Sequence, residues 1–562
     1  MAITYYSHQL RRFGTGFSEK GKTIHHVTTL STETFFKMVS FVRFLSNFRA
    51  LGWPLIAQRY SLFSLRSSPP KFPPMSKGVT PRSEDYARWY TDVVRKAELA
   101  DYGPVKGTMV IRPYGYAIWE LLREAFDSRF KATGHVNAYF PLLIPRSYFS
   151  READHVAGFA KECAVVTHSR LRAAADGGVE VDPESKLEED LVIRPTSETV
   201  IWAMYKQWIN SYRDLPILIN QWANIVRWEL RTRLFLRTTE FLWQEGHTAH
   251  ATATEAREEA LRMLDVYKEV AETEMALPVI ASPKTEAEKF AGAVETWSIE
   301  AMMGDGRALQ AGTSHFLGQN FARAFDVTFR TEANEEEFVW ATSWGVSTRL
   351  VGAVVMAHGD DKGLRLPPRI APVQVVIVPI YKDESKTTVL ESAGKLSADI
   401  EQVGVRVKLD DRETVTPGYK FNDWELKGVP LRIEIGPRDV AAGQAVVVRR
   451  DVDQKQTLPL ETLPAAVPNL LEEIQASLYR QAEEFRALNT SQLDDWKEFK
   501  DLMVKGGFAV CGWDGDPATE TAIKEETKAT IRSILHEEDP SGLTCIYTGK
   551  PARFKVVLAR AY

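Results

Sequence analysis

The sequence predicts a multidomain protein: an α+β domain with an antiparallel sheet, then an α/β domain, then a small α+β domain. In residues 224–250, two aromatic-rich arms flank a basic loop, which is the pattern of two paired strands. Residues 372–450 alternate apolar β-branched runs with helical segments, as α/β sheets do. At 562 residues the chain is long enough for three or four domains.

Residues 1–77 differ in composition from the rest of the chain. They contain eleven Lys or Arg but only two acidic residues, Glu19 and Glu33, and are rich in Ser, Thr and Phe. This composition predicts an organellar transit peptide that ends in a Pro-rich linker, with Met38 as an alternative start. A basic arm that binds RNA is the alternative. No apolar run approaches the roughly 18 residues of a membrane span, so we expect no membrane partner.

The segment after the linker predicts a regular succession of elements. Residues 85–99 are amphipathic and predict a helix. A short strand at 108–113 and a long helix at 114–134 follow, and residues 138–145 read as a strand interrupted by a proline. Residues 251–277 predict a charged helix exposed to solvent.

The stretch at 224–250 combines side chains that suit a ligand with phosphate, amine and planar parts. Residues two apart on a strand share a face. The side chains in question are Arg227, Glu229, Phe241, Trp243, Glu245 and His247. Arginine binds phosphate in a bidentate manner, and aromatic rings accept a stacked base. An ordinary strand with a solvated charged face is the alternative.

Three further signals each have an ordinary alternative. Thr196 and Glu198, two apart, would suit a secondary ammonium group, but the same residues are common helix caps. A Gly-rich stretch carries Gln310, Thr313 and His315. Arg349 begins an apolar helix, where an arginine usually extends to solvent.

Taken in order, these signals resemble the three motifs of class II aminoacyl-tRNA synthetases. The run LRTTEFLWQEGHTAHAT (236–252) is similar to motif 2 of the prolyl-tRNA synthetase family, in its archaeal and eukaryotic type. TSWGVSTRLVGAVVMAHGDDKGLRLPP (342–368) resembles motif 3, and LVIRPTSET (191–199) resembles the family's TxE loop. The helix, strand and proline before residue 146 resemble motif 1 only weakly. The resemblance covers residues 82–562. With the predicted transit peptide in front of it, the chain resembles the plant and algal organellar members of this family.

The resemblance implies roles for individual residues. Arg227 and Arg349 would be catalytic, near the α-phosphate and the γ-phosphate, and Gln310 would contact Mg²⁺ through Mg-ATP. The expected proline-binding residues are Thr196, Glu198, Arg227, Trp243, Glu245, His247, Phe290, His315, Ser343 and Gly345. The expected ATP-binding residues are Arg227, Glu229, Arg237, Thr238, Phe241, Gln310, Thr313 and Arg349. The segment 153–168 would precede the proline pocket, with Cys163 as a small hydrophobic wall residue.

The carboxyl-terminal half implies tRNA recognition. Residues 78–370 would form the catalytic domain and 371–465 an anticodon-binding domain with a mostly parallel sheet. Single-stranded bases are read by stacking and by hydrogen bonds to their edges. The candidates are Lys420, Phe421, Trp424, Glu425, Arg432 and Asp439.

Residues 466–562 read as two helical segments and a short β-containing end. The family commonly binds zinc here through four cysteines. This chain has Asp514, Thr519 and Ser533 near the expected positions, and only Cys545 remains. One thiolate cannot form a tetrahedral site, so we expect no zinc. Three cysteines in all predict no disulfide framework.

The function implied is that of a proline–tRNA ligase, with L-proline, ATP, Mg²⁺ and tRNA(Pro) as ligands. The resemblance also implies a homodimer, located in a chloroplast, a mitochondrion or both. The interval between His247 and Thr342 leaves no room for an inserted editing domain. The alternatives are a non-catalytic paralogue that binds tRNA and a synthetase for another amino acid.

Overall fold

The computed structural model describes residues 78–149, 163–229 and 231–562. All elements below belong to one compact unit, Gly78–Tyr562. The predicted transit peptide at 1–77 and most of the segment expected before the proline pocket, 150–162, lie outside the described residues. No helix in the described ranges is both long and apolar enough to cross a membrane.

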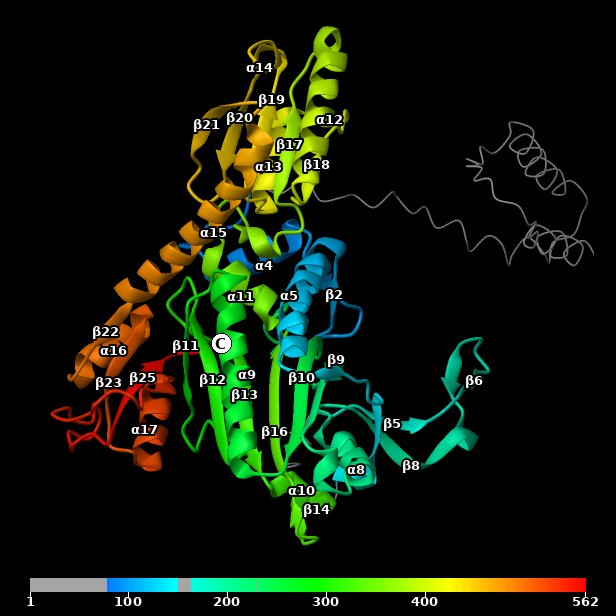
Figure 1. The fold of residues 1–562 in the computed structure, drawn as a ribbon, viewed down its shortest axis with the longest axis vertical. Coiled ribbons are helices and arrows are strands. Elements are labelled where there is room, and N and C mark those ends of the chain that lie inside the picture. Colours follow the sequence, from blue (N-terminus) through cyan, green and yellow to red (C-terminus); the bar gives the residue numbers. More distant parts are fainter. Residues whose placement is uncertain (1–77, 150–162, 230) are drawn as a thin grey trace, which may run out of the picture. The chain divides into compact units, whose positions relative to one another are not determined.

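A seven-stranded sheet forms the centre of the first domain (Figure 1). Its order is β11 (Val279–Pro283), β12 (Glu295–Met302), β13 (Ala308–Gly318), β16 (Trp340–Ser347), β10 (Glu240–His250), β9 (Ile217–Val226) and β3 (Val136–Asn137). Every neighbouring pair is antiparallel except β3 with β9. The predicted α+β architecture is therefore confirmed.

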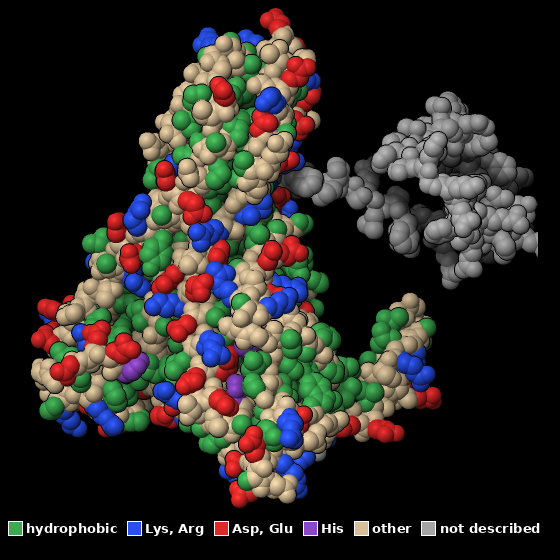
Figure 2. Space-filling view, in the orientation of Figure 1, with side chains coloured by type: hydrophobic (Ala, Val, Ile, Leu, Met, Phe, Trp, Pro, Cys, Tyr) green, Lys and Arg blue, Asp and Glu red, His purple; other side chains and the backbone are tan. Residues whose placement is uncertain are grey.

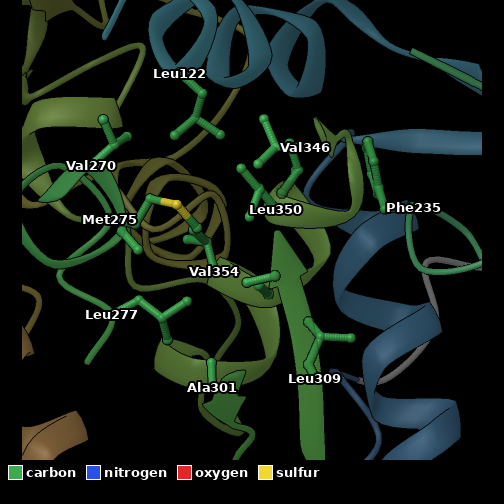
Figure 3. Close-up of a cluster of buried hydrophobic side chains, with 14 of the residues drawn as sticks. Leu122, Phe235, Val270, Met275, Leu277, Ala301, Leu309, Val346, Leu350 and Val354 are labelled. Carbon is green, nitrogen blue, oxygen red and sulfur yellow. The ribbon is translucent and has the colours of Figure 1, made fainter. Parts of the chain in front are cut away.

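Helices α5 (Pro113–Ala132), α9 (Ala253–Thr273) and α11 (Arg349–His358) pack around one core with this sheet. Figure 3 shows Leu122 of α5, Val270 of α9, Leu350 of α11 and Val346 of β16 within this one buried cluster, with Leu350 beside Val346.

The prediction that the helix at 251–277 is exposed to solvent was wrong. Ala260, Met263, Tyr267 and Val270 of α9 are buried. They recur at intervals of three and four residues, which places them on one helical face, and this apolar face packs on the sheet. Most of the charged residues lie on the exposed side, and Glu259 is the buried exception in this helix.

The expected strand at 138–145 is also shorter than predicted. Only β4 (Leu143–Pro145) is a strand; it pairs with β8 (Lys186–Ile193), which pairs in turn with β5 (Val165–His168). Before Pro141, the backbone N–H of Phe140 donates to the side chain of Gln221. The Ala138 N–H still donates to the Asn220 carbonyl, but proline has no N–H to continue a ladder, so the pairing of β4 with β8 starts after it. The helix predicted at 85–99 and the strand predicted at 108–113 agree better with the structure, which has α4 at Tyr86–Lys96 and β2 at Met109–Ile111.

The α/β domain contains a five-stranded sheet in the order β18 (Val407–Leu409), β17 (Val375–Pro379), β19 (Leu431–Ile435), β20 (Gln444–Arg449) and β21 (Lys455–Pro459). The expectation of a mostly parallel sheet holds only for the two pairs made by β17. The last three strands are antiparallel. Their connections at 436–443 and 450–454 are too short for the crossover that parallel strands need.

The carboxyl-terminal region has three helices, not two segments. Helix α15 (Leu463–Leu488) runs through the boundary predicted at 465/466, and α16 (Trp496–Lys505) and α17 (Pro517–Thr527) follow. A four-stranded sheet completes the region, in the order β22 (Thr490–Gln492), β23 (Phe508–Trp513), β25 (Phe554–Ala559) and β24 (Thr530–Ile534).

Candidate active site

Strand register brings the predicted proline-site residues onto one face of the large sheet. Glu245 of β10 lies opposite Gly345 of β16, which lies opposite Thr313 of β13. One step along, His247, Ser343 and His315 form a parallel row. Directly opposite residues share a face, so both rows line the same cavity.

The TxE segment reaches the cavity from the start of helix α8 (Glu198–Trp208). The Thr196 hydroxyl donates to the Glu198 carboxylate, and both residues are buried. Ser197 occupies the cap position but makes no capping bond; its hydroxyl donates to Glu245. The helix-cap alternative for Thr196 and Glu198 is therefore not what the structure shows.

Glu245 and His247 form a buried polar pair. His247 Nε2 donates to Glu245 Oε2 at 2.9 Å, and Gln221 Nε2 donates to Glu245 Oε1 at 2.7 Å. Burial alone would lower the pKa of His247, but the bond to Glu245 and the charges of Glu198 and Glu245 raise it above its ordinary value. His247 Nδ1 is buried and has no hydrogen-bond partner within the described ranges.

The opposite wall is built by Phe290, Thr296 and His315. The Thr296 hydroxyl accepts from the Phe290 backbone N–H at 3.2 Å and lies 2.9 Å from His315 Nδ1. The Phe290 and His315 rings are 4.6 Å apart. One hydroxyl therefore orients the imidazole and fixes the backbone that carries the aromatic ring.

Arg227 follows the end of β9 and points into the same cavity. Its Nε donates to the Pro195 carbonyl at 2.9 Å, and its guanidinium lies over the rings of Phe241 and Trp243 at 5.7 and 5.5 Å. Burial lowers the pKa of Arg227, and Glu198 and Glu245 act in the opposite direction. An arginine keeps its charge under such a shift, so the cavity holds a partly desolvated cation.

Arg349 is the first residue of α11, as predicted, but it does not extend to solvent. Its Nε donates to the Leu236 carbonyl at 3.1 Å. Burial, together with the nearby charges of Arg237 and Arg227, lowers the pKa of Arg349 to about 10. Three guanidinium groups therefore lie close together here, and such a cluster suits a ligand with several negative charges, such as a polyphosphate.

The cavity has a volume of about 290 Å³, and all the predicted proline-binding residues line it, as do Gln310, Thr313 and Arg349. An adjoining cavity is lined by the other predicted ATP-binding residues, Glu229, Arg237, Thr238 and Phe241, together with Arg227 and Arg349. Sequence reasoning missed Glu288, Thr296 and Ser347 in the wall. Thr296 carried a recoverable signal, because a polar residue facing inward from a buried strand needs a partner.

The six anticodon candidates divide into two groups. Trp424, Glu425 and Arg432 line a small pocket with Arg450, and Phe421 lies under the Arg432 guanidinium at 4.6 Å.

The other two candidates have structural partners. Lys420 is buried and donates to the Asp410 carbonyl at 2.8 Å, and Asp439 accepts from the Gly436 N–H at 2.9 Å at the start of α14 (Pro437–Ala441). Trp424, Glu425 and Arg432 likewise have partners within the protein, namely Asp410, Lys362 and Glu434, so which of the six candidates contact tRNA stays a prediction.

Three of the residues at the expected zinc positions, Asp514, Thr519 and Cys545, contact one another, whereas the Ser533 hydroxyl has no hydrogen-bond partner among the described residues. Asp514 accepts hydrogen bonds from Thr519 at 3.1 Å and Thr548 at 2.9 Å, and a bond from Cys545 helps to lower the pKa of Asp514. Ser533 is buried on β24. Among the described residues, no group of three or more His, Cys, Asp or Glu side chains is placed to hold a metal ion.

Comparison with known proteins identifies the class. The model of the tRNA synthetase class II core domain (G, H, P, S and T) matches residues 180–358, that of the anticodon binding domain matches 374–470, and that of the prolyl-tRNA synthetase C-terminal domain matches 496–562. The fold and the site therefore define a class II aminoacyl-tRNA synthetase.

Sequence relatives give the particular family. Proline–tRNA ligases of Bacteroides fragilis and Chloroherpeton thalassium are each 58% identical, over 86% and 87% of this chain and 99% and 100% of their own. That of Salinibacter ruber is 56% identical over 87% of this chain and all of its own. The chain belongs to the prolyl-tRNA synthetase family. Because these relatives are bacterial, the likeness to archaeal, eukaryotic and organellar forms remains a prediction.

Proposed function

We propose that this chain, as a proline–tRNA ligase, activates L-proline with ATP at the described cavity and transfers it to tRNA(Pro). One observation carries the assignment of the cavity. Buried carboxylates and a hydroxyl gather at one end, and the half-buried guanidinium groups of Arg227 and Arg349 line both this cavity and the adjoining one. An amino acid has its cation and its carboxylate at opposite ends, so it fits between these two sets of charges.

The proline end is held by Thr196 and Glu198. The secondary ammonium of proline has two donors and one positive charge, which a hydroxyl and a carboxylate satisfy together. Glu245 and His247 lie beside them, and Trp243, Phe290, His315 and Ser343 would enclose the ring. Gly345 also lines the cavity, and because it has no side chain its backbone can approach the ring closely.

The nucleotide end is held by the two arginines. Arg227 meets the α-phosphate and Arg349 the γ-phosphate, while Phe241 offers a face to the adenine. Glu229, Arg237 and Thr238 contact the rest of ATP from the adjoining cavity. The amide oxygen of Gln310 and the hydroxyl of Thr313 are hard donors of the kind that Mg²⁺ accepts, and such an ion neutralises phosphate charge.

The reaction needs positioning more than acid or base chemistry. The proline carboxylate attacks the α-phosphorus in line, which forms prolyl-adenylate and releases pyrophosphate. Arg227 stabilises the charge that develops on the α-phosphate, in a site where burial makes that interaction strong. The terminal ribose hydroxyl of tRNA then attacks the activated carbonyl, and Trp424, Glu425 and Arg432 would contact the anticodon.

A homodimer through the β3 edge is part of this proposal. Val136, Tyr139 and Leu143 are exposed, and Val136 lies on an edge strand. Figure 2 shows hydrophobic side chains gathered over the region that Figure 1 labels β5 and β9. Apolar patches at a sheet edge favour association with a second chain.

Residues 1–77 support import into a chloroplast, a mitochondrion or both, and the TxE and motif 2 segments support the archaeal and eukaryotic type. We also propose that the carboxyl-terminal domain folds without zinc. Asp514 is the acceptor for Thr519 and Thr548, so these side chains satisfy one another without an ion.

Two substitutions test the two ends of the cavity separately. Glu198→Gln keeps the shape but removes the charge that faces the ammonium, so the proline KM in ATP–pyrophosphate exchange should rise with the ATP KM little changed. Arg227→Ala should slow exchange about 100-fold or more. Arg88→Ala, at an exposed site on α4, is the control. A proline KM unchanged by Glu198→Gln, or an Arg227→Ala enzyme within a few fold of native, would show that the ends are assigned wrongly.

A further inference from the structure

The wall of the cavity that carries Phe290 is attached to the carboxyl-terminal domain. Residues 284–294 connect β11 and β12, and this segment contributes Glu288 and Phe290 to the cavity. Three groups of the carboxyl-terminal domain contact it. Lys524 Nζ donates to Glu288 Oε1 at 3.1 Å, and Arg532 NH1 lies 3.7 Å from Glu288 Oε2. Thr285 Oγ1 donates to Glu520 Oε1 at 2.7 Å.

A buried ionic cluster anchors these contacts. Glu300 of β12 accepts from Lys284 at 2.7 Å and from two nitrogens of Arg532 at 2.8 and 3.1 Å. Lys284 also donates to the Arg532 carbonyl at 3.1 Å. The side chains of Lys284, Glu300 and Arg532 are 1%, 0% and 7% exposed. Removal of one partner from such a cluster would leave an uncompensated buried charge. The cluster therefore fixes the position of the carboxyl-terminal domain against β12 and the 284–294 segment.

The charges explain why the attachment concerns the site. Glu288 is a carboxylate in a cavity that already holds Glu198 and Glu245. The substrates bring a carboxylate and a triphosphate, which a third free carboxylate would repel. Lys524 and Arg532 place two positive charges beside the Glu288 carboxylate and so offset its negative charge. They also fix the segment whose Phe290 ring packs on His315.

We infer that Lys524 and Arg532, with Glu520, are positioning residues for proline binding, through which the carboxyl-terminal domain holds the 284–294 wall of the cavity. This inference rests on the proposed placement of Phe290 at the proline end. It differs from simple docking of two domains, because docking alone predicts loss of stability without a selective effect on one substrate.

The test combines kinetics with hydrogen exchange on the full chain. Lys524→Ala removes a side chain that is 56% exposed, so folding is not at risk. From the usual strength of such exposed pairs we expect a rise of about two- to fivefold in the proline KM. Arg532→Ala should raise it about tenfold or more, and Arg532→Lys should recover part of the loss. The ATP KM should stay within about twofold throughout. Lys497→Ala, an exposed lysine of α16 in the same domain, is the matched control.

Hydrogen exchange tests the attachment of the 284–294 wall separately from the placement of Phe290 at the proline end. Backbone amides of 284–294 should exchange faster in Lys524→Ala than in Lys497→Ala, and saturating proline should reduce the difference. Unchanged hydrogen exchange of the 284–294 amides in Lys524→Ala would overturn the inference outright. Faster exchange with a raised ATP KM and an unchanged proline KM would also overturn it, by showing that Phe290 is not at the proline end. If Arg532→Ala does not fold, Lys524→Ala decides alone.

Discussion

At the scale of single residues, the site depends on charges that the fold keeps out of water. Glu245 accepts from Ser197, Gln221 and His247, so none of its hydrogen bonds needs solvent. Buried carboxylates are tolerated only when they are satisfied in this way. The same bonds orient His247, which leaves its Nδ1 as the buried polar atom that a ligand or a bound water would satisfy.

The Glu245–His247 pair predicts a pH dependence of stability. Because the folded-state pKa of His247 is raised above its ordinary value of 6.5, its contribution is complete below that pH. The contribution is lost as pH rises through the folded-state pKa. The free energy of unfolding of native protein, minus that of His247→Gln, should therefore be largest near about pH 6 and smaller at pH 9. A difference that grows with pH would contradict the pairing.

At the scale of elements, the close packing of β10 and β16 is decided by one glycine. Gly246 lies opposite Trp344, and a Cβ there would fall 2.1 Å from the indole ring. The indole cannot move away freely, because the rings of Phe130 and His135 pack against it at 4.9 and 5.1 Å. The neighbouring residues of Gly246 are Glu245 and His247, so a shift of this strand also shifts the site.

Gly246→Ala is accordingly expected to destabilise the protein by about 1–3 kcal/mol, as overpacking of a core does. Gly394→Ala is the matched control, since that glycine lies in helix α12 (Lys386–Gln402) with open space around it. The control should be neutral or stabilising by up to about 1 kcal/mol. Urea unfolding of both variants measures the difference, and equal midpoints would refute the packing argument.

The elements also show what local sequence can predict. The period of two placed the β10 residues correctly, because strand alternation is a local property. The burial of α9 was missed, although its apolar residues have helical spacing, since the sheet beneath it is assembled from distant strands. Asp439 could have been recognised as a helix-capping residue, because its partner, the Gly436 N–H, lies only three residues before it. The burial of Lys420 against the Asp410 carbonyl could not be predicted locally, because the fold brings these two residues together.

At the scale of the whole molecule, the separation of motifs bears on fidelity. A pocket that admits proline cannot exclude alanine by size, and missing methylenes discriminate by only about 1–3 kcal/mol. The chain between β10 and β16 is occupied by α9, by β11 to β13, by α10 (Asn320–Phe325), and by β14 (Thr328–Arg330) and β15 (Glu336–Phe338). This supports the proposal that no editing domain is inserted there.

The corresponding prediction concerns mischarged tRNA. Purified protein mixed with alanyl-tRNA(Pro) should leave it to decay at the rate seen in buffer, because we propose that no hydrolytic editing domain is inserted between β10 and β16. The matched control is the same protein heated until inactive. Faster decay with the native protein than with either comparison would reveal an editing site.

ATP–pyrophosphate exchange with each standard amino acid in turn tests most directly whether this cavity activates proline. In the proposed assignment, the carboxylate end would select an amino acid, and the Phe290 and His315 wall would select a small ring. We expect strong exchange with proline, weak exchange with alanine and background with the rest. Exchange that is absent with proline, or stronger with another amino acid, would contradict the claim.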